Sequence, residues 1–318
     1  MSLGEFELIE RHFVRPTPRA TLGPGDDCAL FGVAPGHQLA VSSDMLVEGR
    51  HFLSTVPPER LGHKALAVNL SDLAACGAEP LAFTLALALP RADEGFVAPL
   101  AAGLFALAER HGIELVGGDT TAGPLNLCIT VMGQVPVGQA LLRSGAQPGD
   151  ELWVSGRLGD ARLALEVFRG QAALPAADFE AVRRAMECPE PRVALGLALR
   201  GLASSAIDVS DGLLGDLGHV LRRSRVGVRL SLAALPRSAV LAAQPRALQH
   251  ECLLRGGDDY ELLFTAPPSL AAAVREAGER SGTPVTPIGV VTPEPGLVVL
   301  DEDGHAHALP ARGFDHFA

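Results

Sequence analysis

Apolar residues recur at helical spacing near the start of the chain, where Phe6, Ile9 and Phe13 predict a short helix over residues 4–13. A loop rich in proline and glycine follows as far as Asp27. The next apolar segments predict strands at 38–43, 81–89, 114–116 and 127–135, and helices at 58–77 and 94–111. The first part of the chain is therefore expected to be a domain of mixed strands and helices.

Glycine and proline concentrate between Val135 and Glu151, and this interruption of the pattern predicts a domain boundary. Beyond it we expect strands at 151–155 and 205–207, and helices at about 160–169, 191–202 and 212–223. We accordingly expect an N-terminal domain of residues 1–137 and a C-terminal domain of residues 149–318. Both are predicted to combine helices and strands, so the fold class is α/β (α+β).

Composition narrows the class of protein further. Of the 318 residues, 47% are hydrophobic and 20% are charged, which is enough apolar material to bury a core. The 37 acidic residues outnumber the 26 basic ones and give a net charge of −11, which argues against a nucleic-acid partner. Lys64 is the only lysine, so any mechanism that requires a lysine must use it.

The cysteines and the apolar stretches indicate where the protein works. The five cysteines are far apart and form no CxxC pair, so we expect small buried hydrophobic residues in a reducing compartment. The first residues lack the pattern of a secretory signal, and the cytoplasm is the expected location. The long uncharged stretch at 120–142 is interrupted by glycine and proline, so we expect no membrane segment.

Aspartates recur beside small residues where predicted strands end. They lie in Gly25-Asp26-Asp27, Ser42-Ser43-Asp44, Gly117-Gly118-Asp119 and Asp208-Val209-Ser210-Asp211. Asp72 instead lies inside a helical run between Leu70 and Leu73, where burying an unpaired carboxylate is costly. Taken singly, each is also explained as a turn residue, a helix cap or, for Asp72, a salt-bridge partner. Their recurrence favours side chains that converge on a crevice.

Carboxylates brought close together repel one another unless a cation joins them. Ligands that are all oxygen, without His or Cys, favour Mg²⁺, Mn²⁺ or Ca²⁺ over zinc. No segment matches the calcium-binding loop of an EF-hand, so Mg²⁺ is the expected ion, and Mg²⁺ held this way usually shares its coordination with phosphates. The chain has no Walker A, GxGxxG or protein-kinase signature. The acidic glycine segments 117–121 and 256–259 remain, either as tight turns or as loops whose N–H groups approach phosphates.

Several longer motifs occur in a specific order along nearly the whole chain. They are Gly25-Asp26-Asp27-Cys28-Ala29-Leu30, Ser43-Asp44, the run at 65–75, Gly117-Gly118-Asp119-Thr120-Thr121, the runs at 143–150 and 204–213, Gly256-Gly257-Asp258-Asp259-Tyr260-Glu261-Leu262, and Gly313-Phe314-Asp315-His316-Phe317. In combination they resemble the thiamine-monophosphate kinase family, within the superfamily of aminoimidazole ribonucleotide synthetase and selenophosphate synthetase. The last two motifs point to the thiamine-phosphate branch.

The resemblance implies a two-domain fold like that of aminoimidazole ribonucleotide synthetase and a homodimer formed through the N-terminal domain. It implies direct transfer of the γ-phosphoryl group of ATP to thiamine monophosphate, giving thiamine diphosphate, with several Mg²⁺ ions. The N-terminal domain would bind ATP and metal, and the C-terminal domain would complete the active site.

The resemblance also implies a role for individual residues, position by position. The implied metal ligands are Asp27, Ser42, Ser43, Asp44, Asp72, Asp119, Asp208 and Asp211; the nucleotide contacts are Gly118, Asp119, Arg143 and Ser210; the substrate contacts are His51, Asp258 and Phe314. Family members often have Thr at Ser43, Glu at Asp258, and Tyr or Trp at Phe314. Asp258 is therefore one methylene shorter than the family's residue.

One point of chemistry agrees independently with this implication. A phosphate monoester has a second pKa of about 6, so it is already mostly dianionic at neutral pH and needs no general base. No catalytic side chain is then expected, and metal ions with positioning supply most of the effect. Alternatives are another ATP-dependent phosphoryl-transfer enzyme of the superfamily, a metal-dependent phosphate hydrolase, or a non-catalytic nucleotide or metal sensor.

Overall fold

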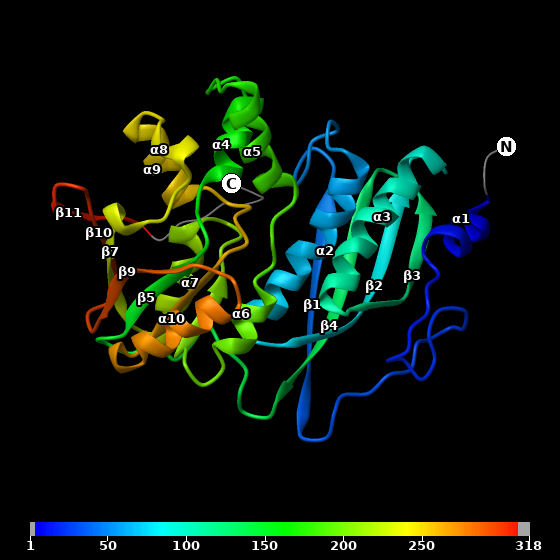
Figure 1. Cartoon of the computed structure of the whole chain (residues 1–318), viewed down its shortest axis with the longest axis horizontal. Coiled ribbons are helices and arrows are strands. Elements are labelled where there is room, and N and C mark those ends of the chain that lie inside the picture. Colours follow the sequence, from blue (N-terminus) through cyan, green and yellow to red (C-terminus); the bar gives the residue numbers. More distant parts are fainter. Residues whose placement is uncertain (1–3, 311–318) are drawn as a thin grey trace. The chain divides into compact units, whose positions relative to one another are not determined.

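The computed structural model describes residues 4–310, and the chain divides into two compact units (Figure 1). The first unit comprises Met1–Leu73 and Ala78–Gly138, and the second comprises Ala74–Gly77 and Gln139–Ala318. Within the described part of the chain, every helix is too short or too polar to cross a membrane. Each unit has its own sheet, so the two are described separately.

The first unit is built on a four-stranded sheet. Its strands are β1 (His37–Val47), β2 (Glu79–Leu89), β3 (Glu114–Ala122) and β4 (Asn126–Pro136), in the order β1-β4-β2-β3. Only the β2–β3 pair is parallel. The helices are α1 (Glu5–His12), α2 (Pro58–Ala75) and α3 (Glu94–His111). Figure 1 shows α2 and α3 side by side on one face of this sheet, the face onto which Phe83, Leu85 and Leu87 of β2 point.

Among residues 4–310, no helix covers the opposite face of β1. Leu39, Val41 and Met45 alternate along the strand and are 50%, 58% and 53% exposed, whereas Leu46 points to the helices and is buried. Alternate residues of a strand point to opposite faces, so these three share one apolar surface with Ser43. The outer edge of the sheet therefore presents apolar side chains to solvent.

Two predicted strands are longer than expected, which corrects the sequence analysis. β1 continues through Ser43 and Asp44 to Val47, and β3 continues through Asp119 to Ala122. Each extension is hydrogen-bonded to a long neighbouring strand, β4 for β1 and β2 for β3. Polar residues continue a strand when such a partner is present, and the sequence pattern does not reveal that partner.

The second unit contains a seven-stranded mixed sheet in the order β11-β10-β7-β9-β5-β8-β6. Its strands are β5 (Glu151–Ser155), β6 (Ser205–Asp208), β7 (Gly227–Ser231), β8 (Leu262–Ala266), β9 (Val285–Thr292), β10 (Gly296–Leu300) and β11 (Ala306–Ala308). Its helices are α4 (Asp160–Phe168), α5 (Ala176–Glu187), α6 (Val193–Ala198), α7 (Leu213–Ser224), α8 (Ala239–Ala242), α9 (Arg246–Arg255) and α10 (Ala271–Arg280), with short 3-10 turns η1 (Leu232–Ala234) and η2 (Pro268–Leu270).

Successive side chains of β5 point to opposite faces of the sheet, so its apolar residues pack in two different layers. Leu152 and Val154 join the core that α4, α7 and α9 form with one face of the sheet. Trp153 points to the other face, where it stacks on Phe264 with ring centroids 6.4 Å apart. The guanidinium of Arg275 on α10 lies 4.9 Å from the centre of the Trp153 ring. Helices therefore cover both faces, and the predicted α/β class is confirmed.

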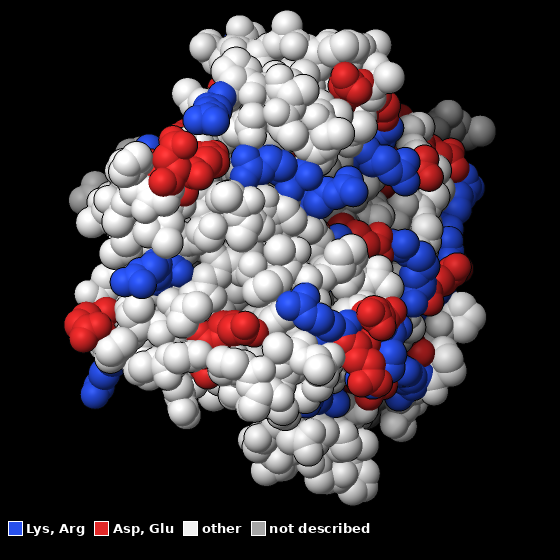
Figure 2. Space-filling model, turned by 60° about the vertical axis from the view of Figure 1, so that its left-hand side comes forward, with Lys and Arg blue, Asp and Glu red and all other residues white. Residues whose placement is uncertain are grey.

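Some sequence expectations were wrong in detail. The helix expected at 191–202 is only α6, because Pro191 precedes it and the chain turns at Gly201, whose φ is +73°. Of the five cysteines, all of which are free, Cys252 is buried but Cys28 is exposed. Figure 2 shows acidic and basic side chains interspersed on one face of the molecule, so its charge is mixed although the net charge is negative.

Two glycines let the backbones of α2 and α3 approach closely. A Cβ atom at Gly62 would lie 1.9 Å from the carbonyl oxygen of Leu100, and one at Gly103 would lie 1.8 Å from that of Glu59. Both distances are far below any allowed contact, and the atoms met are backbone. A side chain at either position therefore forces the helices apart.

Replacing Gly103 by alanine should lower the free energy of unfolding by about 1–3 kcal/mol, because the added methyl group displaces α2 from its packed position. Urea denaturation followed by circular dichroism measures the change. Gly32→Ala is the matched control, since a Cβ there meets nothing within 4 Å. Equal midpoints for the Gly103 variant and wild type would show that the helices separate without cost.

Candidate functional site

Two polar side chains of α2 reach the backbone and side chains of β1. The hydroxyl of Ser42 donates to Oδ2 of Asp72 over 2.5 Å. Oδ1 of Asn69, one turn earlier on α2, accepts the N–H of Asp44 over 3.0 Å. Asn69 is buried and its own amide donates to the carbonyl of Ala65. Ser42, Asp44 and Asp72 are thus brought together on the helix-covered side of the sheet, and Asn69 joins a set from which the sequence analysis omitted it.

Ser43 points away from this set because it follows Ser42 in a strand. Its hydroxyl lies 2.9 Å from that of Thr130 and donates to the carbonyl of Ile129 on β4. Ser43 is exposed on the same face as Met45. Ser42 and Ser43 therefore point to opposite faces of the sheet.

A second group of predicted residues lies near β3. A pocket of about 200 Å³ is lined by the loop at 24–27 and the segment at 115–120, so Asp27, Gly118 and Asp119 come together there. Gly118 has a φ of +150°, and a Cβ at this position would lie 1.9 Å from the carbonyl oxygen of Leu85. Only glycine fits against the backbone of β2 at this position. Gly118 is itself exposed, beside the two exposed carboxylates.

These two groups occupy opposite edges of the sheet, because β1 and β3 are its outermost strands. Three strand spacings separate Asp44 from Asp119, which is roughly 14 Å. Within this unit the predicted metal ligands therefore form two separate groups.

Within residues 4–310, three ligand atoms of His, Cys, Asp or Glu lie within 4.8 Å of one another only at Asp301, Asp303 and His305. This cluster includes none of the predicted ligands. Oδ1 of Asp301 accepts the N–H groups of Asp303 and His305, as in an ordinary Asx turn. The cluster is explained by the turn before β11.

His51 follows β1 and is held by its backbone surroundings. Its Nδ1 accepts the N–H of Val47 over 3.0 Å, which fixes the ring with Nδ1 unprotonated. Nζ of Lys64 donates to the carbonyl of His51 over 3.1 Å, and Lys64 is only 2% exposed. The only lysine of the chain therefore positions the turn that carries His51.

In the second unit, the segment after β6 carries a third group of predicted residues. The N–H of Val209 donates to the carbonyl of Glu261, and the carbonyl of Ser210 accepts the N–H of Asp258 over 2.9 Å. A Cβ at Gly257 would lie 2.4 Å from the carbonyl oxygen of Ser210. The two sequence motifs thus run side by side, and the glycine is required by their close approach.

Asp258 adopts an unusual backbone conformation. Its φ is +67° and that of Tyr260 is +51°, values in the left-handed region that residues other than glycine rarely adopt. The hydroxyl of Tyr260 donates to Oδ1 of Asp258 over 3.2 Å. Strain of this kind persists where neighbouring contacts impose it, and it is often found at functional sites.

Arg143 is exposed close to α7. Its carbonyl accepts a hydrogen bond from Ser224 at the end of this helix. Burial, together with the positive charges of Arg222 and Arg143, lowers the pKa of His219. The negative charge of Asp211 acts on this pKa in the opposite direction but is the smaller effect. Arg143, Asp211 and α7 are therefore within electrostatic range of one another. Phe314, the last predicted contact, lies outside the described residues.

Asp216 is a member of this group that the sequence analysis missed. It is 3% exposed, and its Oδ2 accepts the N–H groups of Ser210 and Asp211, each over 3.0 Å. Burial, followed by the charges of Asp208 and Asp211, raises the pKa of Asp216 to about 8. The signal available in the sequence was an aspartate within the apolar run of residues 213–217. Three carboxylates gathered in this way are an environment that a cation would stabilise.

A separate cavity of about 540 Å³ lies in the same unit, lined by segments that include Arg157, Arg192, Asp259 and Glu261. Arg192 donates two hydrogen bonds to Glu261, over 2.6 and 2.7 Å, and Ser155 donates to the same carboxylate. Asp259 accepts the N–H of Gly159 at the start of α4. Burial raises the pKa of Asp259 well above its usual range. Arg192, Glu261 and Asp259 thus have partners within the wall, so we assign the cavity no ligand.

Asp259→Asn should flatten the dependence of stability on pH. The folded carboxyl ionises at a higher pH than the unfolded one, which ionises above pH ~4, so the contribution of Asp259 to the free energy of unfolding falls as pH rises beyond that point. Asparagine accepts the same hydrogen bond and has no such titration. Urea denaturation at about pH 5 and about pH 7.5 should give a smaller difference for the variant than for wild type. Equal differences would mean that Asp259 is ionised in the folded protein.

Models of two protein families match the chain. The model described as AIR synthase related protein, N-terminal domain, matches residues 25–135. The corresponding C-terminal domain model matches residues 147–302. Together they account for most of both units.

Individual relatives match over almost the whole length. The thiamine-monophosphate kinase of Escherichia coli K12 is 44% identical over 326 residues, covering 100% of this chain and 99% of the relative. The crystal structure of thiamine-monophosphate kinase from Stenotrophomonas maltophilia K279a is 47% identical, with a TM-score of 0.88, and the match covers 96% and 99% of the two chains. AaThiL, solved in complex with AMPPCP and TMP, is 29% identical with a TM-score of 0.77, over 90% of this chain and 89% of its own.

Proposed function

The chain belongs to the thiamine-monophosphate kinase family, and we propose how its residues carry out the reaction of that family, the ATP-dependent phosphorylation of thiamine monophosphate to thiamine diphosphate. ATP and thiamine monophosphate are its two substrates. The observation that carries the proposal is the hydrogen bond between Ser42 and Asp72, because it puts a half-buried helix carboxylate beside the Ser-Ser-Asp motif of β1.

We assign Mg²⁺ as the cofactor, since the donor set contains only carboxylates and hydroxyls. The proposed ligands are those named from the sequence, and they lie in separate groups: Asp27, Ser42, Ser43, Asp44, Asp72, Asp119, Asp208 and Asp211. Ser43 would bind on the face of β1 opposite to Ser42 and Asp44. The raised pKa of Asp216 beside Asp208 and Asp211 supports a cation in that group. Bound Mg²⁺ would offset the repulsion between two anionic substrates and hold the transferred phosphoryl group.

The chemical step needs no general base from the protein. The phosphate oxygen of thiamine monophosphate attacks the γ-phosphorus of ATP, the bond from that phosphorus to the bridging oxygen breaks, and ADP leaves with the electron pair. The buried ammonium of Lys64 donates to the carbonyl of His51, which supports a structural role for the only lysine. The protein then contributes by positioning the two substrates.

Nucleotide contacts are assigned to Gly118, Asp119, Arg143 and Ser210. Gly118 belongs to exposed backbone of β3 that a phosphate can approach, and Arg143 offers an exposed positive charge. Thiamine-phosphate contacts are assigned to His51, Asp258 and Phe314. The fixed ring of His51 and the strained backbone of Asp258 support the first two assignments.

We propose further that two copies of the chain pair through residues 1–137, which would also bind ATP and metal, while residues 149–318 supply the remaining groups. The apolar surface of Leu39, Val41 and Met45 supports this pairing, because exposed apolar residues aligned on one strand mark an interface. A second copy would remove this surface from water.

Asp72→Asn should lower the rate of thiamine diphosphate formation by about 100-fold or more, because an amide is a poor ligand for Mg²⁺. Chromatography of the products from ATP, Mg²⁺ and thiamine monophosphate measures the rate, and chelation of the metal should abolish the activity of wild type. Asp178→Asn, at a half-buried aspartate of α5 outside the set, is the control. Normal turnover by a folded Asp72 variant would remove Asp72 from the metal site.

Val41→Asp should convert the dimer into a monomer, since a charge at this position makes burial of the β1 surface unfavourable. Sedimentation velocity gives the mass of each species. Val290→Asp is the control, because Val290 is an exposed valine of the other sheet. A variant that remains dimeric, or a wild type that sediments as a monomer, would contradict pairing through β1.

A further inference from the structure

The backbone of residues 209–211 is held by hydrogen bonds along its length. Val209 exchanges bonds with the neighbouring segment, donating to Glu261 and accepting from Tyr260, and the carbonyl of Ser210 accepts the N–H of Asp258. This leaves the N–H groups of Ser210 and Asp211, and one oxygen, Oδ2 of Asp216, accepts both. A single side chain therefore accepts both of these neighbouring N–H groups.

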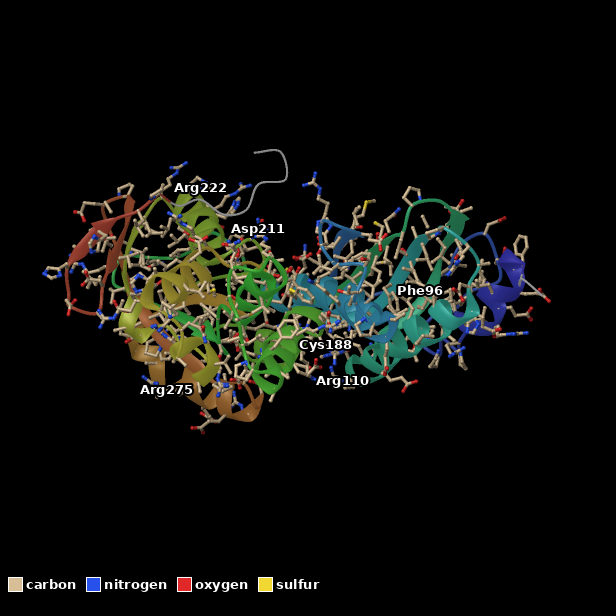
Figure 3. The ribbon with its side chains drawn as sticks, turned by 90° about the horizontal axis from the view of Figure 1, so that it is seen from above. Phe96, Arg110, Cys188, Asp211, Arg222 and Arg275 are labelled. Carbon is tan, nitrogen blue, oxygen red and sulfur yellow. The ribbon has the colours of Figure 1, made fainter. Side chains whose placement is uncertain are left out.

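We propose that Asp216 is a positioning residue, which fixes Ser210 and Asp211 for nucleotide and metal and, through the carbonyl of Ser210, also fixes Asp258. This inference rests on the roles assigned to those three residues under the proposed function. Asp211 is labelled in Figure 3, on the side of its unit away from Cys188, which lines the larger cavity. The segment that Asp216 holds is thus distinct from that cavity.

The contacts of Asp216 differ from those of an ordinary helix cap. The residue at the cap position of α7 is Gly212, which has no side chain, and Asp216 lies within the first turn. Its carboxylate reaches back to N–H groups that precede the helix, whereas a capping side chain accepts from the second or third helical residue. The main effect of Asp216 is therefore to hold the segment before α7, and not to stabilise the helix itself.

The neighbouring backbone leaves the segment little freedom to find other partners. Gly212 has a φ of +106°, and a Cβ there would lie 2.9 Å from the backbone of Arg255. Asp216 is buried, so water does not replace its oxygen without rearrangement. Without this acceptor, two N–H groups lose their partner, and the segment must move to satisfy them.

Substitutions separate positioning from metal binding. Asp216→Asn keeps one oxygen that can accept both N–H groups, whereas Asp216→Leu has a similar volume and no acceptor. If Asp216 acts through Ser210 and Asp211, asparagine should restore function that leucine abolishes. If Asp216 were itself a metal ligand, asparagine would be as damaging as leucine.

Steady-state kinetics with varied ATP at saturating thiamine monophosphate and Mg²⁺ measure the functional effect. We expect the asparagine variant to remain close to wild type, and the leucine variant to lose about 100-fold in kcat/KM for ATP through both kcat and KM. Wild-type kinetics for the leucine variant, or equal loss in both variants, would overturn the proposal. Asp211→Asn, at a proposed metal ligand, should be inactive in the same assay.

Amide hydrogen exchange tests the positioning role separately from activity. The N–H groups of Ser210 and Asp211 should be protected in wild type and in Asp216→Asn, and should exchange at least about tenfold faster in Asp216→Leu. If the leucine variant fails to fold, unprotected amides in wild type would still overturn the proposal. If these amides behave as expected but wild type forms no thiamine diphosphate, the proposed function fails and the hydrogen-bonding role stands.

Discussion

Repulsion among carboxylates is the constraint on which the segment between β6 and α7 depends. Asp208, Asp211 and Asp216 raise the free energy of one another's charged forms, and burial adds to this. The fold tolerates the arrangement because Asp216 accepts two backbone N–H groups. This clustering of negative charge lowers the stability of the fold, and the same clustering favours binding of a cation together with phosphates.

The same principle of holding backbone with buried polar side chains recurs in the first unit. Asn69 holds the N–H of Asp44, and Lys64 holds the carbonyl of His51. Glycines complete the framework where two backbones meet, as Gly118 does against β2 and Gly257 against Ser210. The proposed binding residues Asp44 and His51 are thus carried on segments that Asn69 and Lys64, which lie outside the proposed set, hold in place.

The proposed metal ligands of the first unit are divided between the two edges of its sheet and, in β1, between its two faces. Asp44 and Asp72 lie near β1, whereas Asp27 and Asp119 lie near β3. The apolar outer surface of β1 lies on the face opposite to Asp44, and Ser43 shares it. An interface formed there would exclude water beside Ser43 and strengthen any interaction of its hydroxyl with a metal ion.

Donor types and hydrophobic periods are local properties, so the amino-acid sequence predicts the type of chemistry, the elements of the first unit and several elements of the second. It limits the candidate ligands to oxygen donors and places Asp72 in a helix. The tertiary structure then shows that Ser42 meets Asp72 while Ser43 faces the other way, and that Asp216 holds Ser210. The contact between Ser42 and Asp72 depends on the strand order β1-β4-β2-β3 and on how α2 packs against β1. The contact between Asp216 and Ser210 depends on the chain folding back on itself over six residues. Strand order and such local reversals arise from packing of the whole chain, and no short pattern encodes them.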